Sequence, residues 1–461
     1  MYAHDTIAAI ATPPGQGGVA IIRVSGPEAE GVARRMFRLH NPTAQVRSHT
    51  LYFGRVIDPH SEHTLDEGLL TLMHAPHSYT GEETAEIHCH GGGFLAHRIL
   101  SVVLQQGARL AQPGEFTQRA FLNGRLDLSQ AEAVLDLIQA KSDQGVHLAM
   151  EQLSGRLSEA YAAVRERLLH LTAYVEAFLD FPEDDIPERA QTELEQDAIA
   201  LIERLTALAS TFTQGKVYRE GVRTVIVGKP NVGKSSLLNL LLDEERAIVT
   251  AIPGTTRDMI EETVVVGGIP LVLCDTAGLR QTTDEVEQLG VHRTRAGIDT
   301  AELILAVFDG SRYIDEEDQS VLAILSGKNV ILLLNKTDLP PLFDETCVVT
   351  HFPAQSLVKI SAVTGEGKAL LEKRIHDIIF GHAADGAPQQ SAIVSHLRHR
   401  DALLKTKQFL DNALAGLRSG LPLDLVAVDL HAALAHIGEI TGHITSEDIL
   451  DRIFREFCIG K

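Results

Sequence analysis

The sequence predicts a multidomain protein in which an α/β nucleotide-binding domain is inserted into a helical bundle that follows an N-terminal α/β domain. Three changes in the spacing of apolar residues lead to this prediction. Short apolar runs with Pro/Gly turns fill residues 1–120, helical spacing fills 121–217 and returns within 383–461, and strands alternate with helices over 218–382. We expect the two helical stretches to pack together as one split domain.

Length and composition indicate a globular protein of two or three domains. The 461 residues carry a formal net charge of −21, so any RNA contact must come from local basic patches. The four cysteines are far apart and form no CxxC pair, which favours a reducing, cytoplasmic location. The start of the chain lacks a signal-peptide pattern and no apolar run reaches about 18 residues, so we expect no membrane association.

Within residues 1–120, His88 and His90 would share one face of a strand, and His97 would follow about a turn beyond. Three imidazoles can bind a metal. No carboxylate stands at ligand spacing, however, so packing or hydrogen bonding is the favoured interpretation. We expect strands near 7–11, 19–24 and 69–73 and helices near 27–38 and 94–106.

The stretch from Leu126 to Phe178 has apolar residues at helical spacing and is broken only at Gly145 and Gly155. It predicts long bundle helices. The acidic residues 180–188 include two prolines, which favours a solvated turn between helices. Another helix is expected over 190–215.

The stretch Gly228–Ser235 fits the phosphate-binding pattern of Gly, four free positions, Gly, Lys and Ser. A buried strand over 222–227 and a helix over 236–242 are predicted on either side, which makes a chance match less credible. Free amide groups at the start of that helix would hold a polyphosphate. Lys234 would reach the β- and γ-phosphates, and the Ser235 hydroxyl would ligate Mg²⁺.

Three further motifs follow in the order that a GTPase requires. Thr256, in Pro253–Thr256, could complete the Mg²⁺ coordination, and Asp275, in Asp275–Gly278, would bind Mg²⁺ through water. Asn335–Asp338 follows another predicted strand, where the Asp338 carboxylate would accept hydrogen bonds from guanine that adenine cannot give. Ser361-Ala362 would lie behind the guanine O6. Together these motifs predict a Ras-like P-loop GTPase domain that binds GTP and GDP.

The hydrolytic residues depart from the Ras pattern. Leu279 stands where Ras-like proteins carry a glutamine that orients water, so hydrolysis is slow or another group replaces that glutamine. Asn231, inside the phosphate loop, suits a bound monovalent cation that would stabilise charge developing on the phosphates. Alternatively, Asn231 merely caps the loop.

These motifs resemble the MnmE (TrmE) family of tRNA-modification GTPases over essentially the whole chain. The residues that carry the resemblance are Gly228–Ser235, Gly254–Asp258, Asp275–Arg280, Thr12–Gly15, Gly114–Thr117, Arg119–Asn123 and the terminal Phe457–Lys461. The resemblance implies an aminomethyltransferase-like, folate-binding N-terminal domain that dimerises, a split helical domain and an inserted G domain. It also implies a heterotetramer with the FAD-dependent protein MnmG (GidA), which together modify C5 of the wobble uridine in certain tRNAs.

The family's site residues carry over by motif position. A 5-formyl-tetrahydrofolate-type cofactor would be bound by Arg23, Glu86, Arg125 and Lys461, although Arg125 by itself looks like a surface residue at a helix start. Glu287 matches the catalytic glutamate that orients water, although alone it would look like a charge on a solvated loop. K⁺, which stimulates G-domain dimerisation in the family, would be held by Asn231, Thr250, Ile252 and Thr255, with Mg²⁺ on Ser235 and Thr256. The expected nucleotide contacts are Asn231, Val232, Gly233, Lys234, Ser235, Ser236, Thr250, Ala251, Ile252, Pro253, Gly254, Thr255, Thr256, Asp275, Thr276, Ala277, Gly278, Asn335, Lys336, Thr337, Asp338, Ser361, Ala362 and Val363.

Two features remain open. Cys458 is a candidate catalytic thiol only if its pKa is depressed, and a packed or site-lining cysteine is the simpler interpretation. The basic run His396–Arg400, with Lys405 and Lys407, is a candidate tRNA contact or a solvated helix face. The functional alternatives are an RNA- or ribosome-binding assembly switch and a folate-dependent one-carbon transferase regulated by a G domain.

Overall fold

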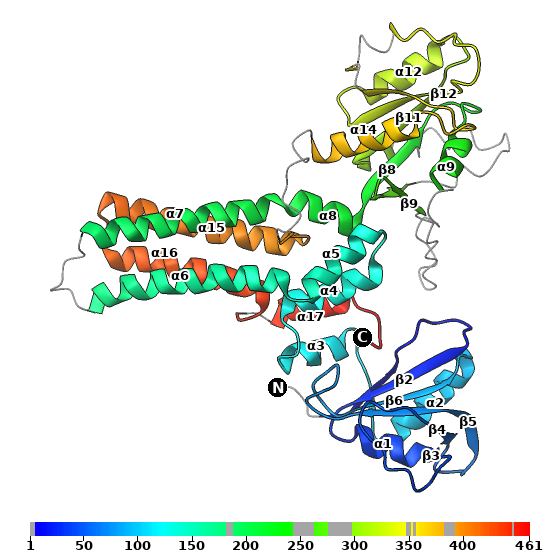
Figure 1. Cartoon of the computed structure of the whole chain (residues 1–461), viewed down its shortest axis with the longest axis vertical. Helices are drawn as coiled ribbons and strands as arrows, with labels where there is room; N and C mark the ends of the chain where they lie inside the picture. Colours follow the sequence, from blue (N-terminus) through cyan, green and yellow to red (C-terminus); the bar gives the residue numbers. More distant parts are fainter. Residues whose placement is uncertain are drawn as a thin grey trace. The chain divides into compact units, whose positions relative to one another are not determined.

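The computed structural model describes residues 5–180, 188–242, 262–274, 297–346, 352–353, 356–381, 392–444 and 447–461. The chain forms two compact units. The first comprises Met1–Leu135, Gln152–Glu195 and Phe409–Lys461, and the second comprises Asp136–Glu151 and Gln196–Gln408. Helices α4 (Leu128–Gln139), α7 (Glu188–Ser210) and α15 (Leu397–Ser419) contribute residues to both units (Figure 1).

The first unit contains a seven-stranded sheet in the order β3-β4-β5-β6-β2-β1-β7, antiparallel except where β1 pairs with β7. Its strands are β1 (Ile7–Ile10), β2 (Val19–Ser25), β3 (Phe37–Leu39), β4 (Tyr52–Ile57), β5 (Thr64–Met73), β6 (Thr84–His90) and β7 (Arg109–Leu110). Strand residues that alternate along the sheet, such as Ile22, Val24 and Ile87, are buried against helices α1 (Ala29–Met36) and α2 (Gly93–Gln105).

The other set of alternating residues forms the second face of this sheet. Arg23 pairs in register with Glu86, and beyond them Leu69 is opposite Phe53 on the same face. We call this surface the open face of the sheet.

Helices of the first unit bury the aliphatic positions that the sequence predicts. Leu157, Tyr161 and Leu168 of α6 (Arg156–Asp180) are fully buried, and the helix packs against α16 (Leu423–Thr441). A smaller cluster joins Leu128 and Leu135 to Phe454 and Phe457 at the end of the chain. Helices α3 (Glu115–Leu122) and α17 (Glu447–Arg455) contribute to this region. The C-terminal motif is therefore anchored by its phenylalanines.

The second unit contains a six-stranded sheet in the order β13-β12-β11-β8-β10-β9, parallel except for the edge strand β9. Helices α9 (Lys234–Leu242) and α14 (Lys368–Phe380) bury leucines against one face, and α12 (Glu316–Leu325) covers the other. This is the doubly wound arrangement predicted for the inserted domain. The strands are β8 (Val222–Val227), β9 (Glu262–Val266), β10 (Ile269–Leu273), β11 (Leu303–Asp309), β12 (Val330–Asn335) and β13 (Leu357–Lys359).

The helix expected over 190–215 is α7, which ends at Ser210, and a separate helix α8 (Phe212–Glu220) continues to the start of β8. Helix α5 (Asp143–Leu153) lies almost entirely in the second unit, where a Cβ on Gly145 would stand 2.8 Å from the Tyr218 carbonyl oxygen. No helix among the described residues is long and apolar enough to cross a membrane.

Candidate functional site

The phosphate loop connects β8 to α9 through residues of unusual backbone conformation. Asn231 and Gly233 both have positive φ angles, +61° and +98°. A Cβ on Gly233 would stand 2.2 Å from the Asn335 side-chain nitrogen, so only glycine fits between the loop and β12. The loop is thus shaped by its sequence to bring backbone amides to the start of α9, where an anion is favoured.

Lys234 lies over this loop with its ammonium group turned inward. Its Nζ donates hydrogen bonds to the carbonyl oxygens of Gly228 at 2.7 Å and Lys229 at 2.6 Å. Burial lowers the pKa of this lysine because the charged form is partly removed from water. A cation with neutral carbonyl partners in a half-buried loop is suited to receive a phosphate group.

The Asn335–Asp338 stretch is hydrogen-bonded to the phosphate loop, although the two are about 100 residues apart in the sequence. Asn335, which ends β12, donates to the Val232 carbonyl oxygen at 2.8 Å and accepts from the Ala362 amide at 2.9 Å. One buried amide side chain therefore joins three of the predicted nucleotide-binding stretches. Ser361 in turn donates to the Asp338 carboxylate at 2.6 Å, which orients that carboxylate beside the same loop.

Sequence reasoning missed one residue of this region, Asp309 at the end of β11. Lys336, which has a φ of +66°, donates from Nζ to Asp309 Oδ2 at 2.6 Å and to the Asn231 carbonyl oxygen at 2.9 Å. Burial alone would raise the pKa of Asp309, but hydrogen bonds from Lys336 and Ser311 outweigh it and lower that pKa. The signal was available, because Asp309 ends a buried strand whose parallel neighbours end in the predicted motifs.

Several predicted nucleotide and metal contacts lie outside the described residues. Within the described part, Val232 is buried, whereas Ser235, Ser236 and Val363 are at least partly exposed. Thr337 lies with its neighbours in the loop that follows β12, where its amide donates to the Ile360 carbonyl oxygen at 3.4 Å. The contacts outside the described residues are Thr250, Ala251, Ile252, Pro253, Gly254, Thr255, Thr256, Asp275, Thr276, Ala277, Gly278 and Glu287, together with the Leu279 position.

The predicted folate residues gather at the open face of the first unit. Arg23 Nε donates to Glu86 Oε1 at 2.8 Å across neighbouring strands, and the two side chains are 17% and 15% exposed. The Arg23 guanidinium lies over the Tyr79 and Phe116 rings, 5.6 and 5.7 Å from their centroids. The pair thus lies in a setting of charge and aromatic surface that planar, hydrogen-bonding ligands favour.

The C-terminal residues join this group. The Gly460 carbonyl oxygen accepts from Arg23 Nη1 at 3.4 Å, and a Cβ on Gly460 would stand 2.3 Å from the Ile10 carbonyl oxygen, so the motif requires glycine there. Burial lowers the pKa of Lys461, the Arg23 charge lowers it further, and the Glu86 charge opposes both. Two cations held together in this way favour an anionic group between them.

Arg125 and Cys458 are more peripheral. Arg125 Nε donates to the Ser78 carbonyl oxygen at 3.2 Å, and Ser78 directly precedes Tyr79, so Arg125 contacts the segment that packs on Arg23. Cys458 is exposed, and its carbonyl oxygen accepts from the Gly114 amide at 3.5 Å. It therefore lies beside the site, not packed into a core.

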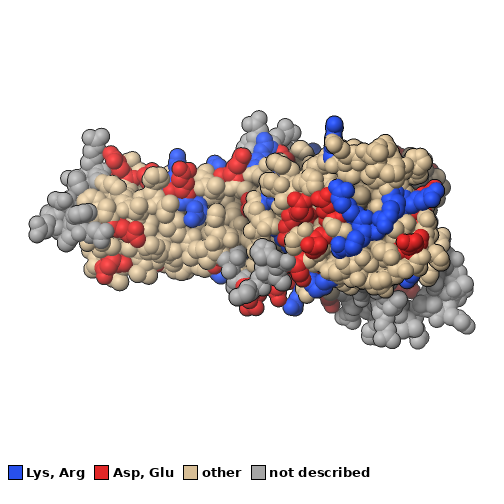
Figure 2. Space-filling model, turned by 90° about the horizontal axis from the view of Figure 1, so that it is seen from below, with Lys and Arg blue, Asp and Glu red and all other residues tan. Residues whose placement is uncertain are grey.

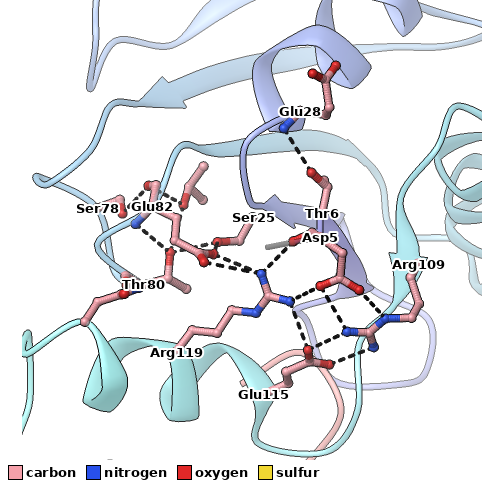
Figure 3. A network of polar contacts seen from close by, with 12 residues as sticks. Asp5, Thr6, Ser25, Glu28, Ser78, Thr80, Glu82, Arg109, Glu115 and Arg119 are labelled. Carbon is pink, nitrogen blue, oxygen red and sulfur yellow. Dashed lines mark hydrogen bonds and ion pairs between the residues drawn. The ribbon is translucent and has the colours of Figure 1, made fainter. Parts of the chain in front are cut away.

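An ion network centred on the buried Arg119 joins the start of α3 to the segment before β1 (Figure 3). Arg119 is 2% exposed and contacts Asp5 at 2.7 Å, Glu115 at 3.1 Å and Glu82 at 3.2 Å, while Arg109 bridges Asp5 and Glu115. Hydrogen bonds from Arg109 and Arg119 lower the pKa of Asp5, and they lower the pKa of Glu115 although its burial works in the opposite direction. The Gly114–Thr117 and Arg119–Asn123 motifs thus hold α3 against the N-terminal strands.

The basic run His396–Arg400, with Lys405 and Lys407, is partly buried. His399 is 1% exposed, His396 bonds to Asp136 at 2.8 Å, and the Arg400 guanidinium lies 4.7 Å from the centroid of the Phe212 ring. These three side chains have partners within the second unit, whereas Lys405 of the same run is exposed, so a tRNA contact and a solvated face both stay predictions.

The histidines considered as possible metal ligands do not converge. His88 approaches Glu86 at 3.5 Å, and His90 bonds to Asp66 at 2.8 Å. Among the described residues, the side chains that could together hold a metal are instead Glu30, His74 and Glu83. His74 Nδ1 already lies 2.8 Å from Glu83 Oε2.

A glycine-shaped phosphate loop with a half-buried lysine, bonded through Asn335 to an Asn-Lys-Thr-Asp loop, defines the class of P-loop GTPases. Family models of the MnmE helical domain and of the GTP-binding protein TrmE N-terminus match residues 128–458 and 6–125. The chain is 49% identical to the tRNA modification GTPase MnmE of Geobacter metallireducens and 49% identical to that of Geobacter sulfurreducens, with 100% of each chain covered. The chain therefore belongs to the MnmE family of tRNA modification GTPases, and it is a GTP hydrolase that acts in tRNA modification.

A solved structure, the G domain of the T. maritima FeoB iron transporter, is also similar. It is 28% identical and covers 34% of this chain and 98% of its own, with a TM-score of 0.26.

Proposed function

We propose that GTP binds across the phosphate loop, with its base at Asp338 and Ser361 and its β- and γ-phosphates at Lys234. The observation that carries this proposal is the hydrogen-bonded junction of Asn335 with Val232 and Ala362. That junction fixes the distance between the phosphate-binding and base-binding loops before any ligand arrives. A preorganised site of this kind loses less entropy on binding.

The chemistry is attack of water on the γ-phosphorus with cleavage of its bond to the β–γ bridging oxygen. We propose that Glu287 orients the water in place of the glutamine that Leu279 replaces, while Lys234 stabilises charge on the phosphates. The hydroxyls of Ser235 and Thr256 would hold Mg²⁺, which neutralises phosphate charge when bound. Oxygens of Asn231, Thr250, Ile252 and Thr255 would hold K⁺; Asn231, with its positive φ, lies at the turn of the phosphate loop.

The Arg23 group is proposed to bind a 5-formyl-tetrahydrofolate-type cofactor. Glu86 would accept hydrogen bonds from the pterin amino and ring N–H groups, and Arg125 and Lys461 would take carboxylate or carbonyl oxygens. The residues fit such a ligand, because Lys461 is held close to Arg23 with a lowered pKa and aromatic faces of Tyr79 and Phe116 flank the site. Cys458, three residues before Lys461, is a further candidate residue of this site, as a catalytic thiol.

For the assembly, we propose a cytoplasmic homodimer that works with an FAD-dependent MnmG-type partner. Together they would add an aminomethyl or carboxymethylaminomethyl group to C5 of the wobble uridine in certain tRNAs. Family membership supports this interpretation over an RNA-assembly switch or a folate-dependent transferase. Mass spectrometry of wobble uridine in cells that lack the protein tests it, and an unmodified uridine is the expected result.

The cation proposal has its own test. GTP turnover of the full chain is measured in K⁺ and in Na⁺ at equal ionic strength, for the parent and for Asn231→Ala. We expect faster turnover in K⁺ for the parent and equal rates for the variant. Equal rates in both salts for the parent would remove Asn231 from the cation site.

The folate proposal is tested by titrating 5-formyl-tetrahydrofolate into the full chain. Glu86→Gln should weaken binding by about 1.5–3 kcal/mol, the range for hydrogen bonds to charged groups. Glu67→Gln is a matched control, because Glu67 is an exposed carboxylate on the same sheet. Equal affinity in both variants would argue against Glu86 as a ligand.

A further inference from the structure

Strands β3 and β4, at one edge of the first sheet, carry arginines that no described carboxylate neutralises well. Arg38 on β3 and Arg55 on β4 are direct register partners, so two like charges face each other across the sheet edge. Such pairs destabilise a sheet. Arg55 has an ion pair with Glu67 at 3.4 Å, but both side chains are more than half exposed, so the pair contributes little.

Arg38 has no carboxylate within ion-pair distance among the residues that the structure describes. Its Nη1 instead donates to the carbonyl oxygens of Arg34 and Arg35 at the end of α1. Those two arginines are also exposed, and Arg34 is paired with Glu30 at 2.6 Å, so Arg35 and Arg38 add most to the positive charge here. Figure 2 shows a group of Lys and Arg side chains on one face of the molecule, with Asp and Glu side chains beside it. Positive charge gathered at one sheet edge stands out in a chain whose formal net charge is −21.

Aromatic side chains accompany the arginines. Phe53 is 51% exposed and lies two residues before Arg55, so both project from the open face. His40 follows β3, and its ring lies 5.8 Å from the Phe53 ring. An exposed aromatic surface between arginines on a sheet is the arrangement on which unstacked nucleic acid bases stack.

The arginine–aromatic surface is continuous with the Arg23–Glu86 group. Both lie on the open face, and β4 is separated from β2 by β5 and β6. At about 4.8 Å per strand, the two groups are roughly 14 Å apart across the sheet. The face between them carries Leu69 and His88, which are register partners and partly exposed.

We propose that Arg38, Arg55 and Phe53 form a docking surface for a single-stranded segment of the tRNA substrate. The arginines would contact phosphates and Phe53 would stack on a base, with the strand running along the open face toward Arg23 and Glu86. Charge complementarity selects a polyanion, and the aromatic surface selects unpaired bases over a lipid surface or a duplex. The inference rests on tRNA modification as the activity and extends it to a recognition surface.

The test measures binding of an anticodon stem–loop RNA to the full-length chain by fluorescence anisotropy over a range of salt concentrations. Arg38→Gln/Arg55→Gln removes two phosphate contacts, which should lower the slope of log K against log salt by about 1.4 and the affinity by about 25-fold at 0.1 M salt. Phe53→Ala should weaken binding of the loop by about 5- to 150-fold and leave binding of a duplex of the same length unchanged.

Arg167→Gln/Arg204→Gln is the matched control, because both arginines are exposed and belong to helices α6 and α7, not to the strands of the sheet. It should bind RNA as the parent does. Since charged edge strands also prevent sheets from pairing edge to edge, light scattering checks that the Arg38/Arg55 variant stays unaggregated. GTP turnover is measured in parallel. If the parent chain does not hydrolyse GTP, that result counts against the proposed function and not against this surface.

Three results would overturn the proposal. The first is equal RNA affinity and salt slope for the parent and the Arg38/Arg55 variant. The second is absence of RNA binding by a parent chain that hydrolyses GTP. The third is binding to vesicles with anionic lipid headgroups, sensitive to the same substitutions, without binding to RNA.

Discussion

In the second unit, the nucleotide site lies where parallel strands end, and its residues come from contiguous motifs. In the first unit, the Arg23 group lies on the face of an antiparallel sheet, and its residues come from β2, β6 and the last residues of the chain. Each nucleotide-binding motif has its functional side chains within a few residues of one another in the sequence. Arg23 and Glu86, in contrast, are brought together only by the register of strands β2 and β6. The two regions therefore depend on different interactions, and single substitutions should affect one region without the other.

The ion network around Arg119 should respond most strongly. Arg119→Met removes the buried cation that Asp5, Glu82 and Glu115 share, although Arg109 still bridges Asp5 and Glu115, so we expect the first unit to lose about 3–5 kcal/mol of unfolding free energy. GTP turnover by the second unit should change little. Chemical denaturation monitored on each unit, with turnover assayed in parallel, would measure both effects, and loss of both together would contradict the separation.

The phosphate loop should show the opposite pattern. Lys234→Ala removes the ammonium group that would stabilise charge on the phosphates, so kcat should fall by about 10²–10³-fold while stability is nearly kept. Lys328→Ala serves as a control, because Lys328 forms an ion pair with Asp299 in the same unit. A comparable loss of kcat in the control would show that removal of any lysine here is harmful.

The junction between loops gives a smaller effect. Gly233→Ala forces a Cβ to within 2.2 Å of Asn335 at a φ of +98°, which should cost about 1–3 kcal/mol and weaken GTP binding. Gly327→Ala introduces the same methyl group at a φ of +78° with no neighbour within 4 Å. Comparing the melting temperatures and GTP affinities of the two variants separates the collision from backbone strain. Equal effects would mean that the Asn335 contact is unimportant.

The smallest expected effect is on how the stability of the first unit depends on pH in the acid range. Because the pKa values of Asp5 and Glu115 are lowered in the folded state, these groups stabilise the protein above their ordinary values of 3.8 and 4.5. That stabilisation is lost as the pH falls through the lowered values. In Arg119→Met these pKa values are lowered less, so the variant should lose less stability than the parent as the pH falls, which denaturation curves between about pH 3 and 6 would reveal. Superimposable pH profiles for the parent and variant would contradict this assignment.

The fold and the nucleotide site were largely predictable because their signals are local. The Gly228–Ser235 pattern and the strand before it specify a loop whose shape depends on nearby backbone atoms. Asp309 escaped notice because its role arises from Lys336 crossing from a neighbouring strand. Arg119 could be recognised as part of a motif, but its carboxylate partners are up to 114 residues away, so its burial could not be predicted.

The burial of part of the basic run His396–Arg400 escaped prediction for a related reason. Its charge suggested a surface, yet His399 is buried and His396 is bonded to Asp136, 260 residues away. Conversely, nothing in the sequence singled out Arg38 and Arg55 until strand pairing placed them side by side. Charge along the sequence was thus a poor guide to charge on the surface, since pairing across the sheet decides which side chains meet.

The most direct test of the nucleotide site is the base preference of Asp338→Asn. The parent should bind GTP more tightly than XTP, because the Asp338 carboxylate accepts hydrogen bonds from the guanine N1–H and 2-amino groups. The amide of the variant donates to the 2-oxo group of xanthine, so the variant should bind XTP more tightly than GTP. An unchanged preference in equilibrium titrations of both proteins would contradict the placement of the base at Asp338.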